Sequence, residues 1–214
     1  MRLGRWRVWT LVPLCAAAIA FVAVCIPTLR HALLRSAGWA LVASDPLHPV
    51  DVIVISGEAD GAGTLEAADL VHEGISARIA VFSGPLDVTG RELLRRGVPY
   101  SDPFVWQLHA LGIKSVEVIP LTEAGTHEEG RVLARWCIEN GYRTVLLVST
   151  PDHSRRTRRI LRRAAVGDGL EVIVRYTRYS DFDPDAWWQT RAGTRTELSE
   201  AEKLLLDLLS HPLS

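Results

Sequence analysis

The chain has 214 residues and a nearly balanced charge, with 24 lysine and arginine residues against 25 aspartate and glutamate residues. This balance disfavours a nucleic-acid partner, because no global positive field is present. Two of the three cysteines, Cys15 and Cys25, lie in an apolar N-terminal run, which leaves Cys137 alone in the remaining chain and excludes a disulfide within that part.

An uncharged, mostly apolar run from Val8 to Leu29 opens the chain. A helix of these 22 residues is about 33 Å long, which matches a hydrocarbon core of about 30 Å. We therefore expect residues 1–36 to form a membrane anchor with one transmembrane helix. More arginines precede the run than follow it, which favours a cytoplasmic N-terminus and a domain on the outer side.

A cleaved signal peptide is the main alternative for this run. The apolar region of a signal peptide usually has only about 7–15 residues and ends in small residues, whereas Ile26, Pro27 and Thr28 end this one. A lipoprotein is disfavoured because neither cysteine in the run follows a small residue, and the length of the run disfavours a buried core helix.

Residues 37–49 are expected to be a short linker, and residues 50–214 to form one α/β domain. The strands in that domain are continuous apolar runs, so both faces of the sheet should be covered. We predict a doubly wound, mainly parallel five-stranded sheet. The expected strands cover 50–55, 77–82, 115–119, 144–148 and 170–176, and the expected helices cover 64–73, parts of 88–112, 127–140, 154–166 and 197–209.

Ligands of such sheets bind beyond the carboxyl ends of the strands. Glycines there let a ligand approach the backbone, and helix N-termini offer N–H donors to an anion. No dinucleotide fingerprint or Walker loop follows the first strand, so NAD and P-loop chemistry are disfavoured and the cofactor stays unknown. No cysteine and histidine cluster has zinc spacing, so no metal site is predicted. The candidate ligand-binding residues at the strand ends are Ser56, Gly57, Glu58, Ser83, Gly84 and Ser149.

The densest polar group follows the fourth strand, where a helix begins. His153 and Arg156 are three residues apart, so they share a helix face and would suit a phosphate or a carboxylate. Asp152 or Ser154 could cap this helix. The alternative is that His153 is an ordinary loop histidine and that the arginines from 155 to 163 form a solvated face, which could also attract anionic lipid head groups.

Thr126 and Glu129 have the spacing of a capping box, and this structural interpretation is favoured. The alternative is that their turn lies beside His153 and that Thr126, Glu128 or Glu129 faces the ligand. In that case Glu129 and His153 are the candidate catalytic acid and base.

Paired tryptophans, Trp187 and Trp188, follow an aspartate-rich turn and precede Arg191 and Arg195. We expect the pair to pack the last helix on the sheet. The alternatives are an aromatic surface over a ligand or a contact with the membrane surface. Within that helix, the spacing of Glu200 and Lys203 predicts an ion pair of small energetic value.

Several of these segments together resemble the YdcF/SanA/ElyC-like envelope proteins over residues 50–208. They are 51–57, 82–84, 125–129 and 147–150 leading to His153 and Arg156, combined with the N-terminal anchor. The resemblance implies a Rossmann-like fold, attachment to a bacterial plasma membrane, and roles in envelope polysaccharide and lipid-carrier processes and barrier function. It implies no single reaction. The pocket residues that it implies are Ser56, Gly57, Ser83, Gly84, Thr126, Glu129, His153 and Arg156.

The chain departs from the family pattern after the first strand. Glu58-Ala59-Asp60 and Glu66 stand where the family has a glycine-rich turn and a following arginine, which puts the charge preference of the pocket in doubt. The match is also loose between Gly84 and Gly112.

Two hypotheses of equal rank follow. In the first, the domain binds and hydrolyses an anionic, phosphorylated envelope intermediate: Arg156 holds the phosphate, His153 is the acid or base, and Glu129 or Glu58 orients water or a metal. In the second, it is a non-catalytic ligand-binding or regulatory module, since no metal cluster or nucleophile elbow is recognisable. A minor third option is a structural envelope partner that uses the paired tryptophans. The expected partners are the lipid bilayer and an anionic small molecule or lipid-linked envelope precursor.

Overall fold

Five short, β-branched runs form one parallel sheet in the computed structural model, which describes residues 26–98 and 102–212. The strand order is β3-β2-β1-β4-β5, and every neighbouring pair is parallel. The predicted five-stranded parallel sheet is therefore confirmed. The strands are β1 (Val52–Ile55), β2 (Ile79–Ser83), β3 (Val116–Pro120), β4 (Thr144–Ser149) and β5 (Glu171–Tyr176).

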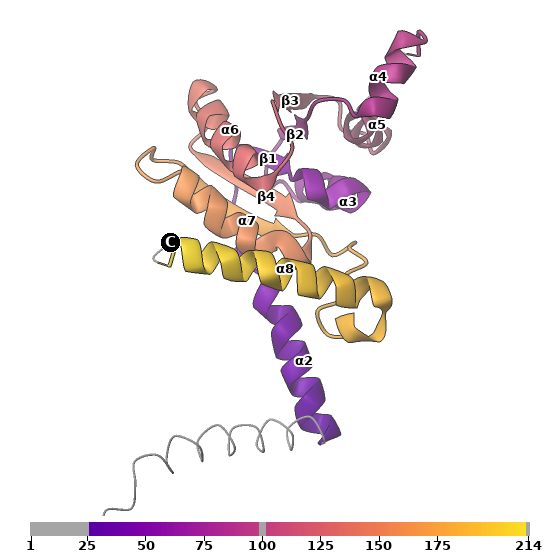
Figure 1. The fold of residues 1–214 in the computed structure, drawn as a ribbon. Coiled ribbons are helices and arrows are strands. Elements are labelled where there is room, and N and C mark those ends of the chain that lie inside the picture. The colour runs from indigo at the N-terminus through magenta and orange to yellow at the C-terminus, as the bar shows by residue number, and fades with distance from the viewer. Residues whose placement is uncertain (1–25, 99–101, 213–214) are drawn as a thin grey trace, which may run out of the picture.

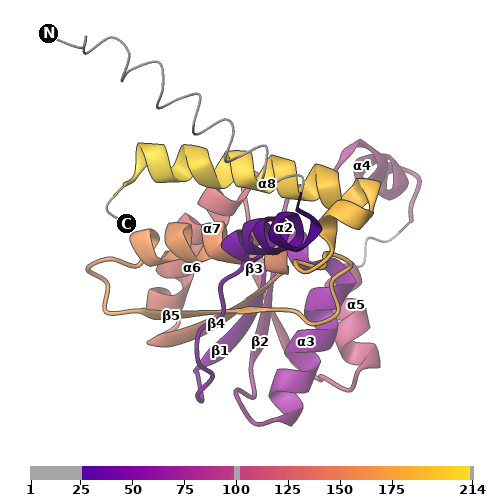
Figure 2. The same cartoon turned by 90° about the horizontal axis from the view of Figure 1, so that it is seen from below.

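Helices cover both faces of the sheet (Figures 1 and 2). On one face, α3 (Asp60–His72) and α5 (Pro103–Ala110) pack on the sheet, and α4 (Val88–Arg95) projects from the domain. On the other face lie α6 (Thr126–Glu139) and α7 (Pro151–Ala164). The short 3-10 helices are η1 (Gly57–Ala59) and η2 (Trp187–Gln189), and the two remaining helices are α2 (Pro27–Leu41) and α8 (Arg191–Ser210).

The middle strand, β1, is buried along its whole length. Its side chains alternate between the two faces: Val52 and Val54 pack toward α6 and α7, and Ile53 and Ile55 pack toward α3 and α5. Because α3 follows β1 on one face and α7 follows β4 on the other, the crossover connections change sides between these two strands. Such a switch point leaves a crevice at the carboxyl ends of the strands.

Three helices begin three or more residues earlier than the sequence pattern predicts, and α3, which starts at Asp60 instead of 64, is one of them. Pro151 occupies the first turn of α7, where the fixed φ of proline suits a helix and its missing N–H costs nothing. In α8, the Thr190 side chain accepts a hydrogen bond from the Gly193 N–H at 2.9 Å and caps the helix six residues before its expected start at 197.

Residues 37–49, which the sequence predicts to be a short linker, are partly helical and contact the sheet. The first residues of this segment complete α2, and Leu41 is buried. Further on, Asp45 joins the sheet edge: its N–H donates to the Val174 carbonyl at 2.9 Å, and its carboxylate accepts from the Val174 N–H at 3.0 Å. Arg158 of α7 pairs with the same carboxylate at 2.9 Å. The segment is thus packed on the α/β unit.

A separate small core joins α2 to α8. It consists of Leu41, Phe182, Trp187 and Leu204, and the Trp187 Nε1 donates to the Leu34 carbonyl of α2 at 2.8 Å. The prediction that Trp187 packs the last helix on the sheet is therefore wrong in its partner, because this tryptophan packs α8 against α2.

The predicted transmembrane run lies mostly outside the described residues. Its last residues, from Ile26 to Leu29, enter the start of α2. In the ranges 26–98 and 102–212, no helix has the length and apolar character needed to cross a bilayer.

We predict that Gly38→Ala loosens α2. A Cβ at this position would lie 2.3 Å from the Pro184 carbonyl oxygen and 2.7 Å from the Trp187 ring. Overpacking of this kind costs about 1–3 kcal/mol of unfolding free energy. Urea unfolding of the full chain in detergent measures the change, and Ser36→Ala on the exposed side of α2 is the control, expected within about 0.5 kcal/mol of the parent. An unchanged Gly38→Ala variant would show that α2 does not pack as described.

Candidate functional site

His153 and Arg156 lie on the first two turns of α7, and their side chains meet as the sequence predicts, with Arg156 Nη2 3.1 Å from His153 Nδ1. The anion that they contact belongs to this chain. Glu200 of α8 places its Oε2 3.0 Å from His153 Nδ1 and 3.1 Å from Arg156 Nη2. The Glu200 side chain is 3 % exposed, and those of His153 and Arg156 are 13 % and 11 % exposed. An external anion would have to displace Glu200 to bind here.

The charges of this group stabilise one another. Burial by itself raises the pKa of Glu200, but hydrogen bonds from His153 and Lys203 and the charge of Arg156 outweigh burial and hold that pKa at about 2. Burial by itself lowers the pKa of His153, yet the Glu200 hydrogen bond and the Asp152 carboxylate raise the pKa above its ordinary value. The buried group therefore consists of the Glu200 carboxylate and two cationic side chains, His153 and Arg156.

The predicted capping box at the start of α6 is wrong. The residue that precedes the helix is Gly125, whose φ of 140° is a conformation that glycine adopts readily, and no side chain caps the helix. Thr126 is already helical, and its hydroxyl accepts a hydrogen bond from Arg156 Nη1 at 3.3 Å. The prediction that Asp152 or Ser154 caps α7 is also wrong. The Ser154 hydroxyl donates a hydrogen bond to the Pro151 carbonyl at 2.8 Å, and no side chain caps that helix.

Glu129 reaches from α6 to the end of β1. Its carboxylate accepts hydrogen bonds from the Ser56 hydroxyl and the Gly57 N–H, both at 3.2 Å. A Cβ on Gly57 would lie 2.9 Å from Glu129 Oε1, so glycine permits this approach. Burial raises the pKa of Glu129 above its ordinary value, although the Gly57 and Ser56 hydrogen bonds oppose the shift. A buried carboxyl with a raised pKa is a candidate acid or base.

A cavity of about 380 Å³ opens beside Glu129, at the carboxyl ends of β1, β2 and β3. Its volume lies in the range of small-molecule sites, roughly 300–1,000 Å³. Among the described lining residues there are four carboxylates and no lysine or arginine. The residues that line it are Gly57, Glu58, Phe82, Gly84, Pro85, Leu86, Asp87, Gly90, Asp102, Pro103, Phe104, Leu121, Ala124, Gly125 and Glu129.

Two of these carboxylates cap helices. Asp87 accepts a hydrogen bond from the Gly90 N–H at 2.7 Å at the start of α4, and Asp102 accepts from the Phe104 N–H at 2.9 Å at the start of α5. Glu58 and Glu129 do not cap a helix and are the candidate carboxylates for a ligand, although Glu129 also accepts hydrogen bonds from Ser56 and Gly57. Glu58 also lies 4.0 Å from His153 Nε2, which links the cavity to the Glu200 group.

The other predicted residues do not line the cavity. Ser56 and Thr126 are buried behind it as hydrogen-bond partners of Glu129 and Arg156. Ser83 is half-buried at the end of β2. Ser149 is fully buried, and its hydroxyl has no hydrogen-bond partner in the described part of the chain.

Sequence reasoning did not assign Glu200 or the helix-capping aspartates to the site. The predicted Glu200–Lys203 pair is present at 2.6 Å. The spacing gave no signal for the contacts of Glu200 with His153 and Arg156, because 44 residues separate Arg156 from Glu200. Asp102 is followed by a proline and then an apolar run, which is a recognisable helix start.

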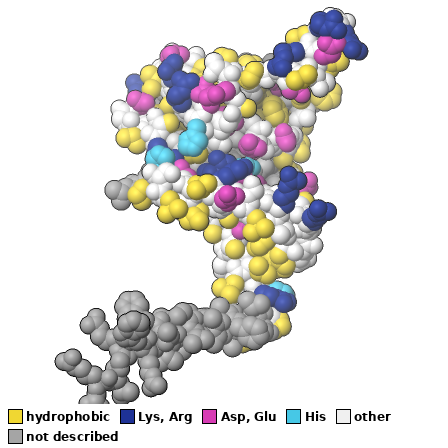
Figure 3. Space-filling view, viewed as in Figure 1, with side chains coloured by type: hydrophobic (Ala, Val, Ile, Leu, Met, Phe, Trp, Pro, Cys, Tyr) yellow, Lys and Arg dark blue, Asp and Glu magenta, His cyan; other side chains and the backbone are white. Residues whose placement is uncertain are grey.

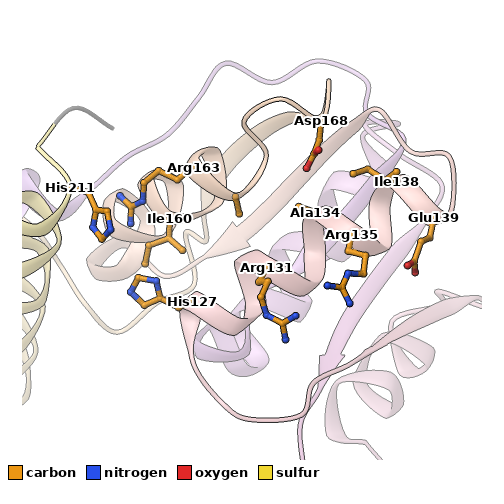
Figure 4. Close-up of a pocket in the computed structure, with 11 residues that line it drawn as sticks. His127, Arg131, Ala134, Arg135, Ile138, Glu139, Ile160, Arg163, Asp168 and His211 are labelled. Carbon is orange, nitrogen blue, oxygen red and sulfur yellow. The ribbon is translucent and has the colours of Figure 1, made fainter.

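A larger groove of about 660 Å³ lies between α6 and α7 (Figure 4). His127, Arg131 and Arg135 project from α6 on one side of it. Arg131 is paired with Glu128, and Arg163 from α7 is paired with Asp207. None of the lining residues belongs to a strand end, where ligands of this kind of sheet bind, so we do not assign the site to this groove.

Comparisons with known proteins show no family for this chain. No family model matches the chain, and no curated protein matches it. Among solved structures, the chain is similar to a universal stress protein in complex with cAMP, with 11 % identity and a TM-score of 0.36 over 62 % of this chain and 100 % of that one. It is also similar to the Aureusimine biosynthetic cluster reductase domain, with 14 % identity and a TM-score of 0.33 over 67 % of this chain and 54 % of that one. Similarities at this level carry no argument, and the envelope-family resemblance stays a prediction.

We predict that Glu200→Ala destabilises the protein by about 3 kcal/mol, because it leaves two buried cations without their carboxylate. Lys203→Ala is the matched control: it removes a half-exposed partner of the same carboxylate and should cost less than about 1 kcal/mol. Urea unfolding of the full chain in detergent measures both. Equal, small losses would mean that His153 and Arg156 do not depend on Glu200.

The two buried glutamates should respond to pH in opposite directions. The folded pKa of Glu200 lies below its ordinary value of 4.5, so its stabilisation is present above pH 4.5 and is lost as the pH falls toward 2. The folded pKa of Glu129 lies above 4.5, so ionising it costs stability as the pH rises.

We therefore expect the stability deficit of Glu200→Gln to be larger at about pH 6 than at about pH 4, and Glu129→Gln to gain stability relative to the parent over the same interval. Both conditions lie below the pKa of His153 in the parent, which burial by itself would lower but the Glu200 hydrogen bond and the Asp152 carboxylate raise above the ordinary value of 6.5. Unfolding free energies at the two pH values measure this, and slopes of the same sign for both variants would contradict the assignment.

Proposed function

We propose that the protein is a membrane-anchored envelope protein whose α/β domain binds and hydrolyses a phosphorylated cell-envelope intermediate in the cavity beside Glu129. The observation that carries the proposal is the buried Glu129 carboxylate, which lines a cavity at the strand ends and has a raised pKa. The envelope setting rests on the apolar run from Val8 to Leu29 and on the family resemblance of residues 50–208.

The phosphate binds at the N-terminus of α6 in this proposal. Gly125, which precedes that helix, lines the cavity, and the first N–H groups of a helix attract anions. Because Glu58 and Glu129 make the cavity acidic, a divalent cation accompanies the phosphate. Mg²⁺ commonly binds through one or two carboxylates together with substrate phosphates, which fits a site where no group of three or more suitable side chains exists among the described residues.

Glu129 acts as the general base in the proposed reaction. Its carboxylate takes a proton from water while the water oxygen forms a bond to phosphorus, and the bond from phosphorus to the leaving oxygen breaks. A carboxylate with a raised pKa is a better proton acceptor than an exposed one. His153 and Arg156 do not hold the phosphate, because Glu200 occupies them. They position α7 and, through His153 and Glu58, influence the charge of the cavity.

A second candidate function is non-catalytic binding of the same class of ligand. The observation that favours it is the engagement of His153 with Glu200, which leaves one buried acid–base group at the cavity. The two candidates share the ligand and the cavity and differ only in turnover.

The test uses the full chain in detergent with polyprenyl pyrophosphate and sugar-phosphate precursors, with Mg²⁺ and with a chelator. We expect Mg²⁺-dependent phosphate release, reduced about 100-fold or more by Glu129→Gln, which keeps the size of the side chain. Glu139→Gln, at the exposed end of α6, is the control and should retain full activity. Binding without turnover would select the second candidate. Turnover that survives Glu129→Gln would contradict the proposed base.

A further inference from the structure

The outer side of α8 exposes leucine side chains. Leu198, Leu205, Leu206 and Leu209 are 64 %, 56 %, 57 % and 71 % exposed. They recur at helical spacing opposite the buried Leu204, with the exposed Glu202 among them, so the outward side of α8 is mainly apolar. Figure 3 shows hydrophobic side chains gathered along the edge of α8 and continuing along α2. Exposed apolar surface of this kind commonly marks a contact with a protein or a membrane.

The position of α8 relative to the expected anchor indicates what covers this side. The apolar run from Val8 to Leu29 leads directly into α2, which begins at Pro27. α8 crosses α2 (Figures 1 and 2) and joins it through the cluster that includes Leu34 and Leu41. Leu34 lies five residues beyond Leu29, roughly 7.5 Å along the helix axis. The head-group layer of a bilayer is about 5–8 Å thick on each side, so the N-terminal end of α8, next to the Trp187 that binds the Leu34 carbonyl, lies at the outer limit of the head groups.

A shallow depression at the N-terminal end of α8 has the composition of a membrane interface. It is lined by Trp188, Arg191, Arg195 and Leu198, among others, and the Trp188 ring stacks on His31 of α2 with 5.8 Å between ring centroids. In the ranges that the structure describes, neither arginine is paired with a carboxylate. Tryptophan is enriched at the level of lipid head groups, and arginines there attract their phosphates.

We propose that α8 lies on the bilayer surface, with the side that carries Leu205 and Leu209 in the head-group region and Arg191 and Arg195 on lipid phosphates. This rests on the membrane attachment in the proposed function and is independent of hydrolysis. Glu200 links the inner side of α8 to His153, which is 4.0 Å from Glu58 at the cavity. Through this contact α8 is connected to the cavity, whose lining residues at the start of α4 lie on the side of the domain away from α2 (Figure 1).

The test places an environment-sensitive fluorophore at Leu205→Cys in full-length protein reconstituted into vesicles of phosphatidylglycerol and phosphatidylethanolamine. Cys15 and Cys25 are replaced by alanine, and Cys137 stays because burial raises the pKa of its thiol to about 12 and leaves it unreactive. The control label is at Val88→Cys, which is 75 % exposed on α4, on the side of the domain away from α2 (Figure 1). Lipids that carry a quencher near the head group report the depth of each label.

We expect quenching at position 205 to exceed quenching at position 88 by about threefold or more. A label at Leu198→Cys should lose most of its quenching when Leu205 and Leu209 are both changed to glutamate, since these exposed substitutions do not alter the core.

Three outcomes distinguish the contact of α8 with the bilayer from the membrane attachment of the whole protein. Vesicle flotation of the protein with equal quenching at 205 and 88 would overturn the α8 contact and leave the anchor intact. Protein that does not float with the vesicles would contradict attachment and this proposal together. A shielded label at 205 that lipid quenchers do not reach would mean that a second copy of the chain covers α8, which also overturns the proposal.

Discussion

The buried Glu200 carboxylate is the contact on which the arrangement of the site depends. It holds two cationic side chains of α7, His153 and Arg156, that would be costly to bury without an anion. By fixing α8 against α7, it also places Leu204 in the small core that holds α2. On the opposite side, Arg156 reaches Thr126 and so connects the same group to the start of α6, the helix that carries Glu129.

The structure contains two polar groups with different roles: one around His153 and Arg156, and one in the cavity at the strand ends. The His153 and Arg156 pair, which resembles an anion site by its residue types, is neutralised within the chain and joins three helices. The cavity at the ends of β1 to β3 instead offers glycines, a helix N-terminus and two carboxylates, Glu58 and Glu129. A ligand that binds there meets a site of acidic character, which is why the proposed phosphate needs a cation with it.

The sequence predicts the sheet well because the strands are continuous apolar runs between glycines and serines. Such runs are typical of parallel strands that are buried on both faces of a sheet. Gly57, Gly84 and Glu129 are at the cavity for a related reason, since parallel strands end at one edge. Other features depend on contacts between distant residues. The spacing of Thr126 and Glu129 favours a capping box, and only the placement of Ser56, more than seventy residues earlier, beside Glu129 shows the other arrangement. The partner of Arg156, Glu200, lies 44 residues away in a different helix, and no local pattern encodes that contact.

A crystal structure of the full chain with pyrophosphate and Mg²⁺ would show which of the two polar groups binds the anion. We expect density in the cavity between Gly57, Gly125 and Glu129, with Glu200 still bound to His153 and Arg156. Density at His153 and Arg156, with the Glu200 side chain displaced from both, would contradict an anion site beside Glu129.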